Sequence, residues 1–174
     1  MAPAMIRFLR LGLVLLVLLV VQNRLLNGFT FAGLRPAVML LVPIAAAIDG
    51  DAVRAAGAGF ASGLVLDLFL ETPVGTCALA FTLLGYGVAA VERTVIRADV
   101  WLQPAVAGIA SAIGVILIAG VAAVFGQPEY ARPTVLAAAA FAGLVNLLLS
   151  IPVTRLVRWA LGAVSGALTE RSYA

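Results

Sequence analysis

Apolar runs separated by short polar stretches divide the chain into six segments. The runs cover residues 8–26, 35–48, 55–70, 74–91, 102–125 and 134–153. A helix needs about 20 predominantly apolar residues to cross the hydrocarbon core of a bilayer, and several of these runs approach that length. The pattern therefore predicts an all-α integral membrane protein, a six-transmembrane-helix bundle in which residues 1–174 form one domain.

Two prolines modify this picture. Pro43 lies inside the second run and is expected to kink that helix. Pro152 is expected to bend the chain at the end of the last run. Residues 154–168, which carry Arg155, Arg158 and Trp159, then predict a helix lying along the membrane interface.

The composition agrees with a membrane location and narrows the chemistry. Of 174 residues, 64% are hydrophobic and only 11% are charged, too few to cover the surface of a soluble domain. Cys77 is the only cysteine and there is no histidine, so His/Cys zinc sites and Ser-His or Cys-His nucleophile pairs are excluded. The sequence has no cluster of basic residues that could bind a nucleic acid. We expect no cofactor, no metal and no catalytic residue.

The arginines predict the orientation. The net charge of +3 comes entirely from arginines, because the chain contains no lysine. With both termini in the cytoplasm, eight arginines are cytoplasmic: Arg7, Arg10, Arg54, Arg93, Arg97, Arg155, Arg158 and Arg171. Three are outside: Arg24, Arg35 and Arg132. Cytoplasmic loops are enriched in positive charge, so six spans with both termini cytoplasmic are predicted.

The third run contains a stripe of small residues that ends in a carboxylate. Ala55, Gly59, Gly63 and Asp67 recur at intervals of four and therefore share one helix face. Small residues let helices approach closely in a membrane, and an aspartate there needs a polar partner. A similar narrow face around Gly85 predicts that the third and fourth helices pair as a hairpin.

These residues belong to a longer motif. Gly59-Phe60, Gly63-Leu64 and Asp67-Leu68 are followed by Pro73, Gly75 and Leu84-Gly85-Tyr86. Between Gly59 and Gly87 the chain resembles the rod shape-determining protein MreD family. The resemblance marks eight residues as a structural or partner-binding motif: Gly59, Phe60, Gly63, Asp67, Pro73, Gly75, Gly85 and Tyr86.

The resemblance also implies a function. Members of this family are non-catalytic subunits of the cell-wall elongation complex in the bacterial inner membrane, where they act in rod-shape maintenance. The implied direct partner is MreC. The peptidoglycan glycosyltransferase and transpeptidase, and indirectly MreB, are further implied partners. Membrane lipid is a further partner, and a homodimer is compatible with the sequence.

Three interpretations of Asp67 remain open at this point. It is a buried anchor for backbone groups beside the Pro73–Gly75 corner, a carboxylate wetted at the outer interface, or an ion- or proton-coupling group. On the sixth helix, Asn146 near Gly143 is expected to hydrogen-bond across the bundle.

Two other functions fit part of the sequence. Energy-coupling-factor vitamin transporters have a substrate-capturing subunit of this size with six helices, a fold that the MreD family is thought to share. The chain offers few polar groups for a vitamin pocket, namely Gln22, Asn23, Asp67 and Tyr130.

The CDP-alcohol phosphotransferases are membrane enzymes whose clustered aspartates bind divalent metals. Asp49, Arg54, Gly63 and Asp67 approach their signature, but Ala46 replaces its first aspartate and Glu71 its last. The apolar segment between Asp49 and Asp67 would hold them too far apart to share a metal.

Overall fold

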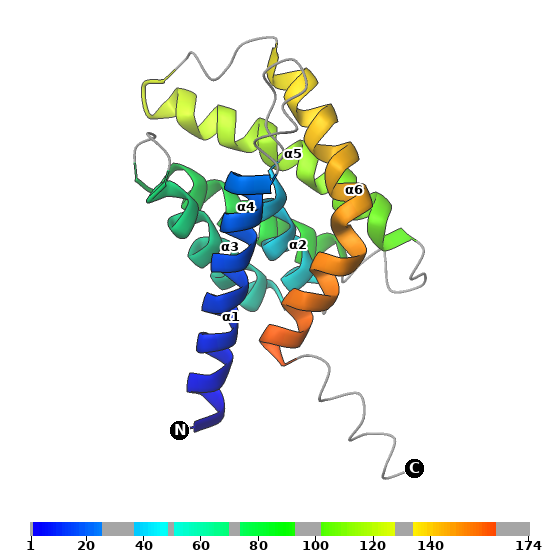
Figure 1. Cartoon of the computed structure of the whole chain (residues 1–174). Helices are drawn as coiled ribbons and strands as arrows, with labels where there is room; N and C mark the ends of the chain where they lie inside the picture. Colours follow the sequence, from blue (N-terminus) through cyan, green and yellow to red (C-terminus); the bar gives the residue numbers. More distant parts are fainter. Residues whose placement is uncertain are drawn as a thin grey trace.

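The computed structural model describes residues 2–25, 37–48, 51–69, 74–92, 102–127 and 134–162. Its regular structure in these ranges is entirely helical (Figure 1). The six α-helices are α1 (Ala2–Val20), α2 (Leu41–Ala47), α3 (Ala52–Asp67), α4 (Thr76–Val91), α5 (Gln103–Val124) and α6 (Thr134–Leu161). A π-helical turn, Val21–Leu25, extends α1, and a 3-10 turn, Val38–Leu40, leads into α2. The predicted all-helical fold and the order of its segments are confirmed.

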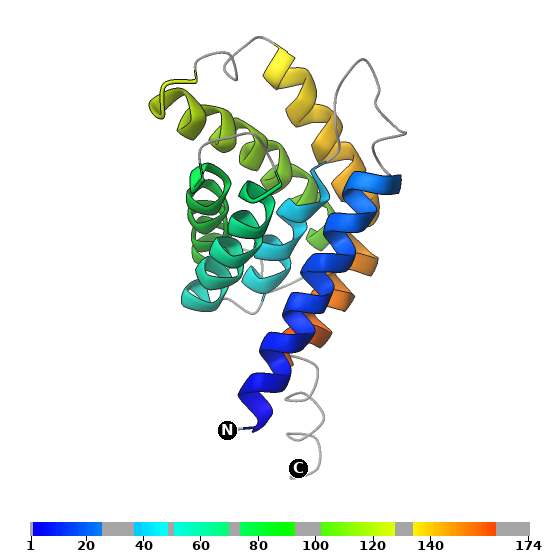
Figure 2. The same cartoon turned by 60° about the vertical axis from the view of Figure 1, so that its left-hand side comes forward.

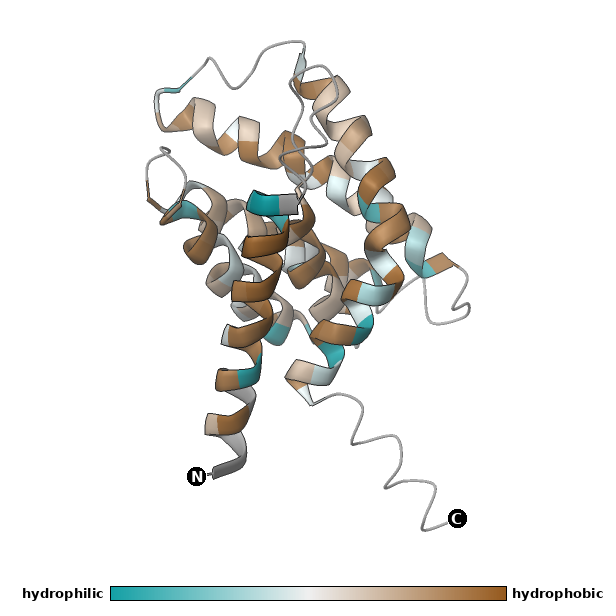
Figure 3. Ribbon diagram, in the orientation of Figure 1, coloured by the Kyte–Doolittle hydropathy of each residue, from teal (hydrophilic) through white to brown (hydrophobic). Residues whose placement is uncertain are grey.

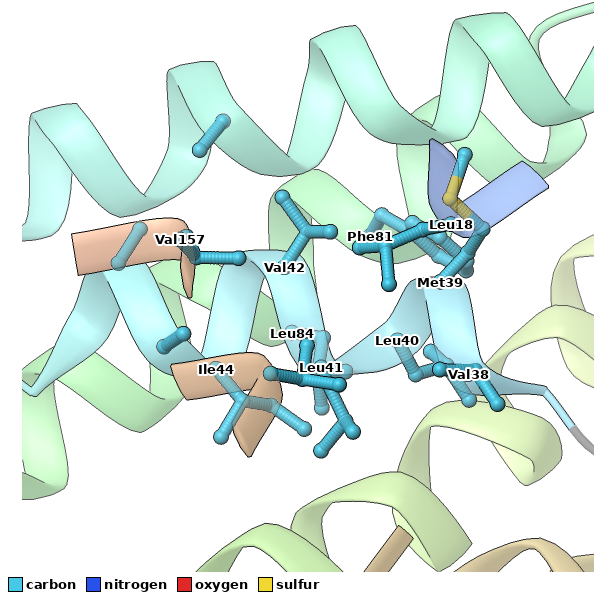
Figure 4. Packing of buried hydrophobic residues seen from close by; sticks show 14 of the residues in the cluster. Leu18, Val38, Met39, Leu40, Leu41, Val42, Ile44, Phe81, Leu84 and Val157 are labelled. Carbon is cyan, nitrogen blue, oxygen red and sulfur yellow. The ribbon is translucent and has the colours of Figure 1, made fainter. Parts of the chain in front are cut away.

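The centre of the molecule is the short helix α2 with the 3-10 turn before it. Every residue from Val38 to Ala47 is buried. Figure 4 shows side chains from three other helices around them: Leu18 of α1, Phe81 and Leu84 of α4, and Val157 of α6. Because the surrounding helices enclose this segment, it does not need the length of a membrane span. It extends only about 15 Å.

Pro43 fits this short helix without a mid-helix break. It is the third residue of α2, in the first turn, where backbone N–H groups have no partner within the α-helix. The sequence predicted a longer second helix over residues 35–48 with a kink at Pro43. The observed change from 3-10 to α-helix falls just before this proline.

Among the helices of the described ranges, two are long and apolar enough to cross a membrane by length and composition, α5 with 22 residues and α6 with 28. Figure 3 shows the apolar residues concentrated along the helix bodies. Shorter apolar helices cover Val38–Ala47 and Thr76–Val91. Apolar side chains on the outer face of α1, including Leu9, Leu13 and Leu16, are exposed.

Helix α6 corrects one expectation from the sequence. It continues through Pro152 to Leu161, so residues 154–161 are not a separate interfacial helix. Val157 and Ala160 are fully buried, and this part of α6 packs with α1 and α2. Burial of these side chains compensates for the backbone hydrogen bond that Pro152 cannot make. The remainder of the predicted interfacial helix, residues 163–168, lies outside the described residues.

The first turn of α1 and the last turn of α6 lie at the same end of the molecule (Figures 1 and 2). The two helices run side by side in opposite directions, and the guanidinium carbon of Arg10 lies 4.9 Å from the ring centroid of Trp159. At the other end of the bundle, α3 passes into α4 through a segment that includes Gly75. This α3–α4 hairpin contains most of the motif found in the sequence.

Candidate functional site: the α3–α4 hairpin

Glycines bring the backbones of α3 and α4 into direct contact. A Cβ added to Gly59 would collide with the carbonyl oxygen of Phe81. One added to Gly63 would lie 2.6 Å from the Cα of Ala78. A Cβ on Gly85 would lie 2.6 Å from the carbonyl oxygen of Ala55. The predicted pairing of the third and fourth helices is therefore confirmed, and its contacts leave no room for a side chain at these glycines.

Asp67 joins the two helices at the end of the hairpin where α3 turns into α4. Its carboxylate accepts hydrogen bonds from the backbone N–H groups of Gly75 at 2.9 Å, Cys77 at 3.0 Å and Ala78 at 3.1 Å. The residue is only 2% exposed. A negative charge at the N-terminus of α4 also interacts favourably with the helix dipole. Asp67 thus corresponds to the buried backbone anchor, and both of its oxygens are engaged by α4.

The local sequence explains why α4 needs a cap from elsewhere in the chain. Its N-cap position is occupied by Gly75, which has no side chain to accept the first N–H groups. Gly75 adopts φ 107°, a left-handed conformation that favours glycine. The glycine that makes the turn therefore cannot also cap the helix, and Asp67 supplies the missing acceptor. Pro73, the other predicted residue of this corner, lies outside the described residues.

The two aromatic residues of the motif point away from these contacts. Phe60 of α3 is 53% exposed, and Tyr86 of α4 is 58% exposed. Each adjoins a residue that packs inside the hairpin, Gly59 in the first case and Gly85 in the second. The motif therefore has an inward part of glycines and a carboxylate, and an outward part of two aromatic side chains.

A second polar contact joins α5, α6 and the start of the central segment. The side-chain amide of Asn146 donates to the hydroxyl of Ser111 at 2.9 Å and to the carbonyl of Ala37 at 3.0 Å. Asn146 and Ser111 are both fully buried. The predicted hydrogen bond of Asn146 across the bundle is confirmed. Sequence reasoning missed Ser111, although a lone hydroxyl within a long apolar run is a usable signal.

The same two helices cross at a pair of glycines. A Cβ on Gly143 would lie 2.9 Å from the carbonyl oxygen of Gly108, and one on Gly108 would lie 3.0 Å from that of Gly143. From the sequence, Gly143 was expected only to lie near Asn146, and Gly108 was not predicted to be a contact. A glycine one turn before Ser111 on α5 was the available signal.

Gln22 also has a structural partner. Its side-chain oxygen accepts the backbone N–H of Met39 at 3.0 Å and so caps the 3-10 turn that precedes α2. The vitamin-transporter interpretation counted Gln22 and Asp67 among the few polar groups available for a ligand. Both use side-chain oxygens to cap helical segments instead.

The residues of the phosphotransferase interpretation do not assemble into a metal site within the described ranges. Asp67 directs its oxygens to α4, whereas Arg54 lies at the other end of α3 beside Asp51, 3.8 Å from its carboxylate. No group of three or more His, Cys, Asp or Glu side chains with metal-binding geometry occurs in this part of the chain. Asp49 and Glu71 lie outside the described residues.

Comparison with known proteins identifies the family. The family model of the rod shape-determining protein MreD matches residues 4–160, which include every described residue of the hairpin. No curated protein and no solved structure matches the chain significantly. The chain belongs to the MreD family of non-catalytic integral membrane proteins that act in bacterial rod-shape determination.

Proposed function

We propose that the outer face of the α3–α4 hairpin docks a membrane helix of a partner in the cell-wall elongation complex, with MreC as the direct partner. The observation that carries this proposal is the exposure of Phe60 and Tyr86, at 53% and 58%, on helices whose backbones are in contact. Large aromatic side chains on a rigid frame make good interface anchors, because little conformational freedom is lost when they bind.

The outer face also has room for close helix approach. Gly57 of α3 and Gly87 of α4 have open space where a Cβ would be. Gly57 lies one turn before Phe60, and Gly87 directly follows Tyr86. A glycine beside an aromatic side chain lets a partner helix pack against the backbone, while the aromatic ring contacts the side of that partner helix.

The proposed role is docking and regulation without catalysis. The hairpin holds the anchors in fixed positions, because α3 and α4 are joined by backbone contact along their length and by Asp67 at the turn between them. A partner helix bound there would be fixed relative to the bundle. Through MreC, this protein would position the glycosyltransferase and transpeptidase, and indirectly MreB. A homodimer is compatible with the same role.

The proposed membrane arrangement has six helices crossing the inner membrane and both termini in the cytoplasm, in a fold like the substrate-capturing subunit of energy-coupling-factor transporters. The common end of α1 and α6 supports termini on one side (Figures 1 and 2). The distribution of arginines supports the cytoplasm as that side. In this arrangement, α2 is enclosed by the other helices and contacts little lipid.

The test replaces both anchors and leaves the inward residues intact. In the double variant Phe60→Ala/Tyr86→Ala, co-purification of MreC should fall about tenfold or more, since truncating an interface anchor commonly costs over 1 kcal/mol. Abundance in the membrane should stay unchanged, and rod-shaped cells should become round. The control is Leu144→Ala, which removes a 62% exposed side chain from α6.

Normal co-purification and normal cell shape in the double variant would contradict the proposal. An equal loss in Leu144→Ala would contradict it as well, because the effect would then be a general consequence of truncating exposed apolar side chains.

A further inference from the structure

Where α1 and α6 lie together, an arginine of α1 contacts an exposed tryptophan of α6, and a second arginine lies one turn before that tryptophan. Arg10 of α1 is exposed, and its guanidinium lies over the ring of Trp159, 4.9 Å from the centroid. Arg155 is exposed and precedes Trp159 by four residues, so the two side chains share one face of α6. Figure 3 shows polar residues on these parts of α1 and α6.

Neither Arg10 nor Arg155 has an acidic residue on its own helix, because neither α1 nor α6 contains an Asp or a Glu. A guanidinium held over an indole ring keeps the N–H groups at its edge available, and a guanidinium matches the geometry of a phosphate. The contact with Trp159 also holds Arg10 in place before any ligand binds, which lowers the entropy lost on binding.

Apolar side chains continue from both arginines along the helices. On α1, Leu13 and Val17 follow Arg10 at three and seven residues and are 59% and 42% exposed. On α6, Ile151 precedes Arg155 by four residues and is 52% exposed. A ligand that suits this surface has an anionic head and an apolar tail. Trp159 is 46% exposed, as expected for a tryptophan at the membrane–water boundary.

The geometry points to a binding site for the phosphate of an anionic phospholipid, formed by Arg10 and Arg155 beside Trp159, with the acyl chains along the exposed faces of α1 and α6. This site is on different helices from the α3–α4 hairpin and does not depend on the docking proposal. Its occupant is a lipid, because the arginines and the apolar stripes together match a phosphate carrying acyl chains.

Trp159 itself can report the lipid beside it. The chain has two tryptophans, so Trp101→Phe leaves Trp159 as the only one. Protein reconstituted in phosphatidylcholine vesicles would receive a small fraction of brominated phosphatidylglycerol, or the same fraction of brominated phosphatidylcholine. Bromine quenches nearby tryptophan fluorescence, so the ratio of the two quenching constants measures the preference for the anionic lipid.

We expect phosphatidylglycerol to be preferred, and Arg10→Gln or Arg155→Gln to lower the preference about fivefold each, since a basic residue near an anionic membrane surface contributes about a factor of that size. Arg10→Lys should retain part of the preference, because it keeps the charge but loses the planar donor group. The control is Arg24→Gln, which removes an exposed arginine from the π-helical turn after α1, at the other end of that helix, and should leave the preference unchanged.

Equal quenching by the two lipids in the parent protein would overturn the site. An equal loss in Arg24→Gln would overturn it too, since net charge alone would then explain the preference. Loss of the preference on adding millimolar inorganic phosphate would assign the site to free phosphate instead of lipid. Quenching by brominated phosphatidylcholine should be the same in all variants, which verifies that Trp159 keeps its depth in the membrane.

Discussion

The N-terminus of α3 is capped by one residue, whereas the N-terminus of α4 needs two, Gly75 for the turn and Asp67 for the hydrogen bonds. In α3, Asp51 occupies the N-cap position, and its side chain accepts the N–H groups of Val53 and Arg54 at 3.1 and 3.0 Å. In α4, Gly75 occupies that position because the turn requires φ 107°, and the carboxylate comes from Asp67 at the end of α3. The cap of α4 is consequently also a contact between helices.

This difference in capping predicts different responses to the same substitution. In Asp67→Asn, an NH₂ group replaces one acceptor among backbone donors in a buried site, so stability should fall by about 1–3 kcal/mol. Asp51→Asn is the control, because asparagine is as good an N-cap as aspartate, and it should change stability little. Thermal unfolding in detergent measures both. Equal unfolding temperatures for the two variants would contradict this prediction, because the charge of the buried cap Asp67 would then contribute no more to stability than that of Asp51.

At the scale of elements, the hairpin is held by backbone contact at three glycines and the α5–α6 pair by one glycine crossing. Ser111 and Asn146 add a polar contact to the second pair. In both pairs, small residues determine where the helices touch, and large apolar side chains such as Leu83 and Leu144 remain outside. Packing between helices thus depends on a few positions that cannot accept a larger side chain.

Alanine substitutions at Gly63 and Gly87 separate two effects on stability, the loss of a close helix contact and the gain in helix propensity. Gly63→Ala should destabilise the protein by about 1–3 kcal/mol, because its methyl group meets the backbone of Ala78. Gly87→Ala has open space and should stabilise the protein by about 0.5–1 kcal/mol, since alanine favours a helix more than glycine does. Unfolding temperatures of the two variants in detergent provide the measurement. A stabilising Gly63→Ala would contradict the close approach.

The sequence was sufficient to predict the helical segments and the pairing of α3 with α4, because glycines four residues apart on a helix identify a contact face. It could not show that α2 is short and central, since an apolar run does not reveal what surrounds it. It could suggest an anchor at Asp67, but not that the carboxylate would bind backbone N–H groups at the N-terminal end of α4. It also placed a boundary at Pro152, where buried side chains such as Val157 hold α6 together.

In the whole molecule, the described residues form a bundle around α2 (Figure 2). An aromatic surface and a basic surface lie on different pairs of its helices. The hairpin exposes Phe60 and Tyr86, and the α1–α6 pair exposes Arg10 and Arg155. The first surface suits a partner helix and the second an anionic lipid. A protein of the MreD family with these two surfaces would bind its partner and the surrounding membrane through separate helices.

Site-specific photo-crosslinking in growing cells can show whether the motif has an inward part for the hairpin and an outward part for docking. A photoreactive phenylalanine analogue would replace Phe60, Tyr86 or, as the control on α6, Leu144. We expect adducts with MreC from positions 60 and 86 and none from 144. Adducts with MreC from position 144 alone, or from none of the three in cells that contain MreC, would contradict it.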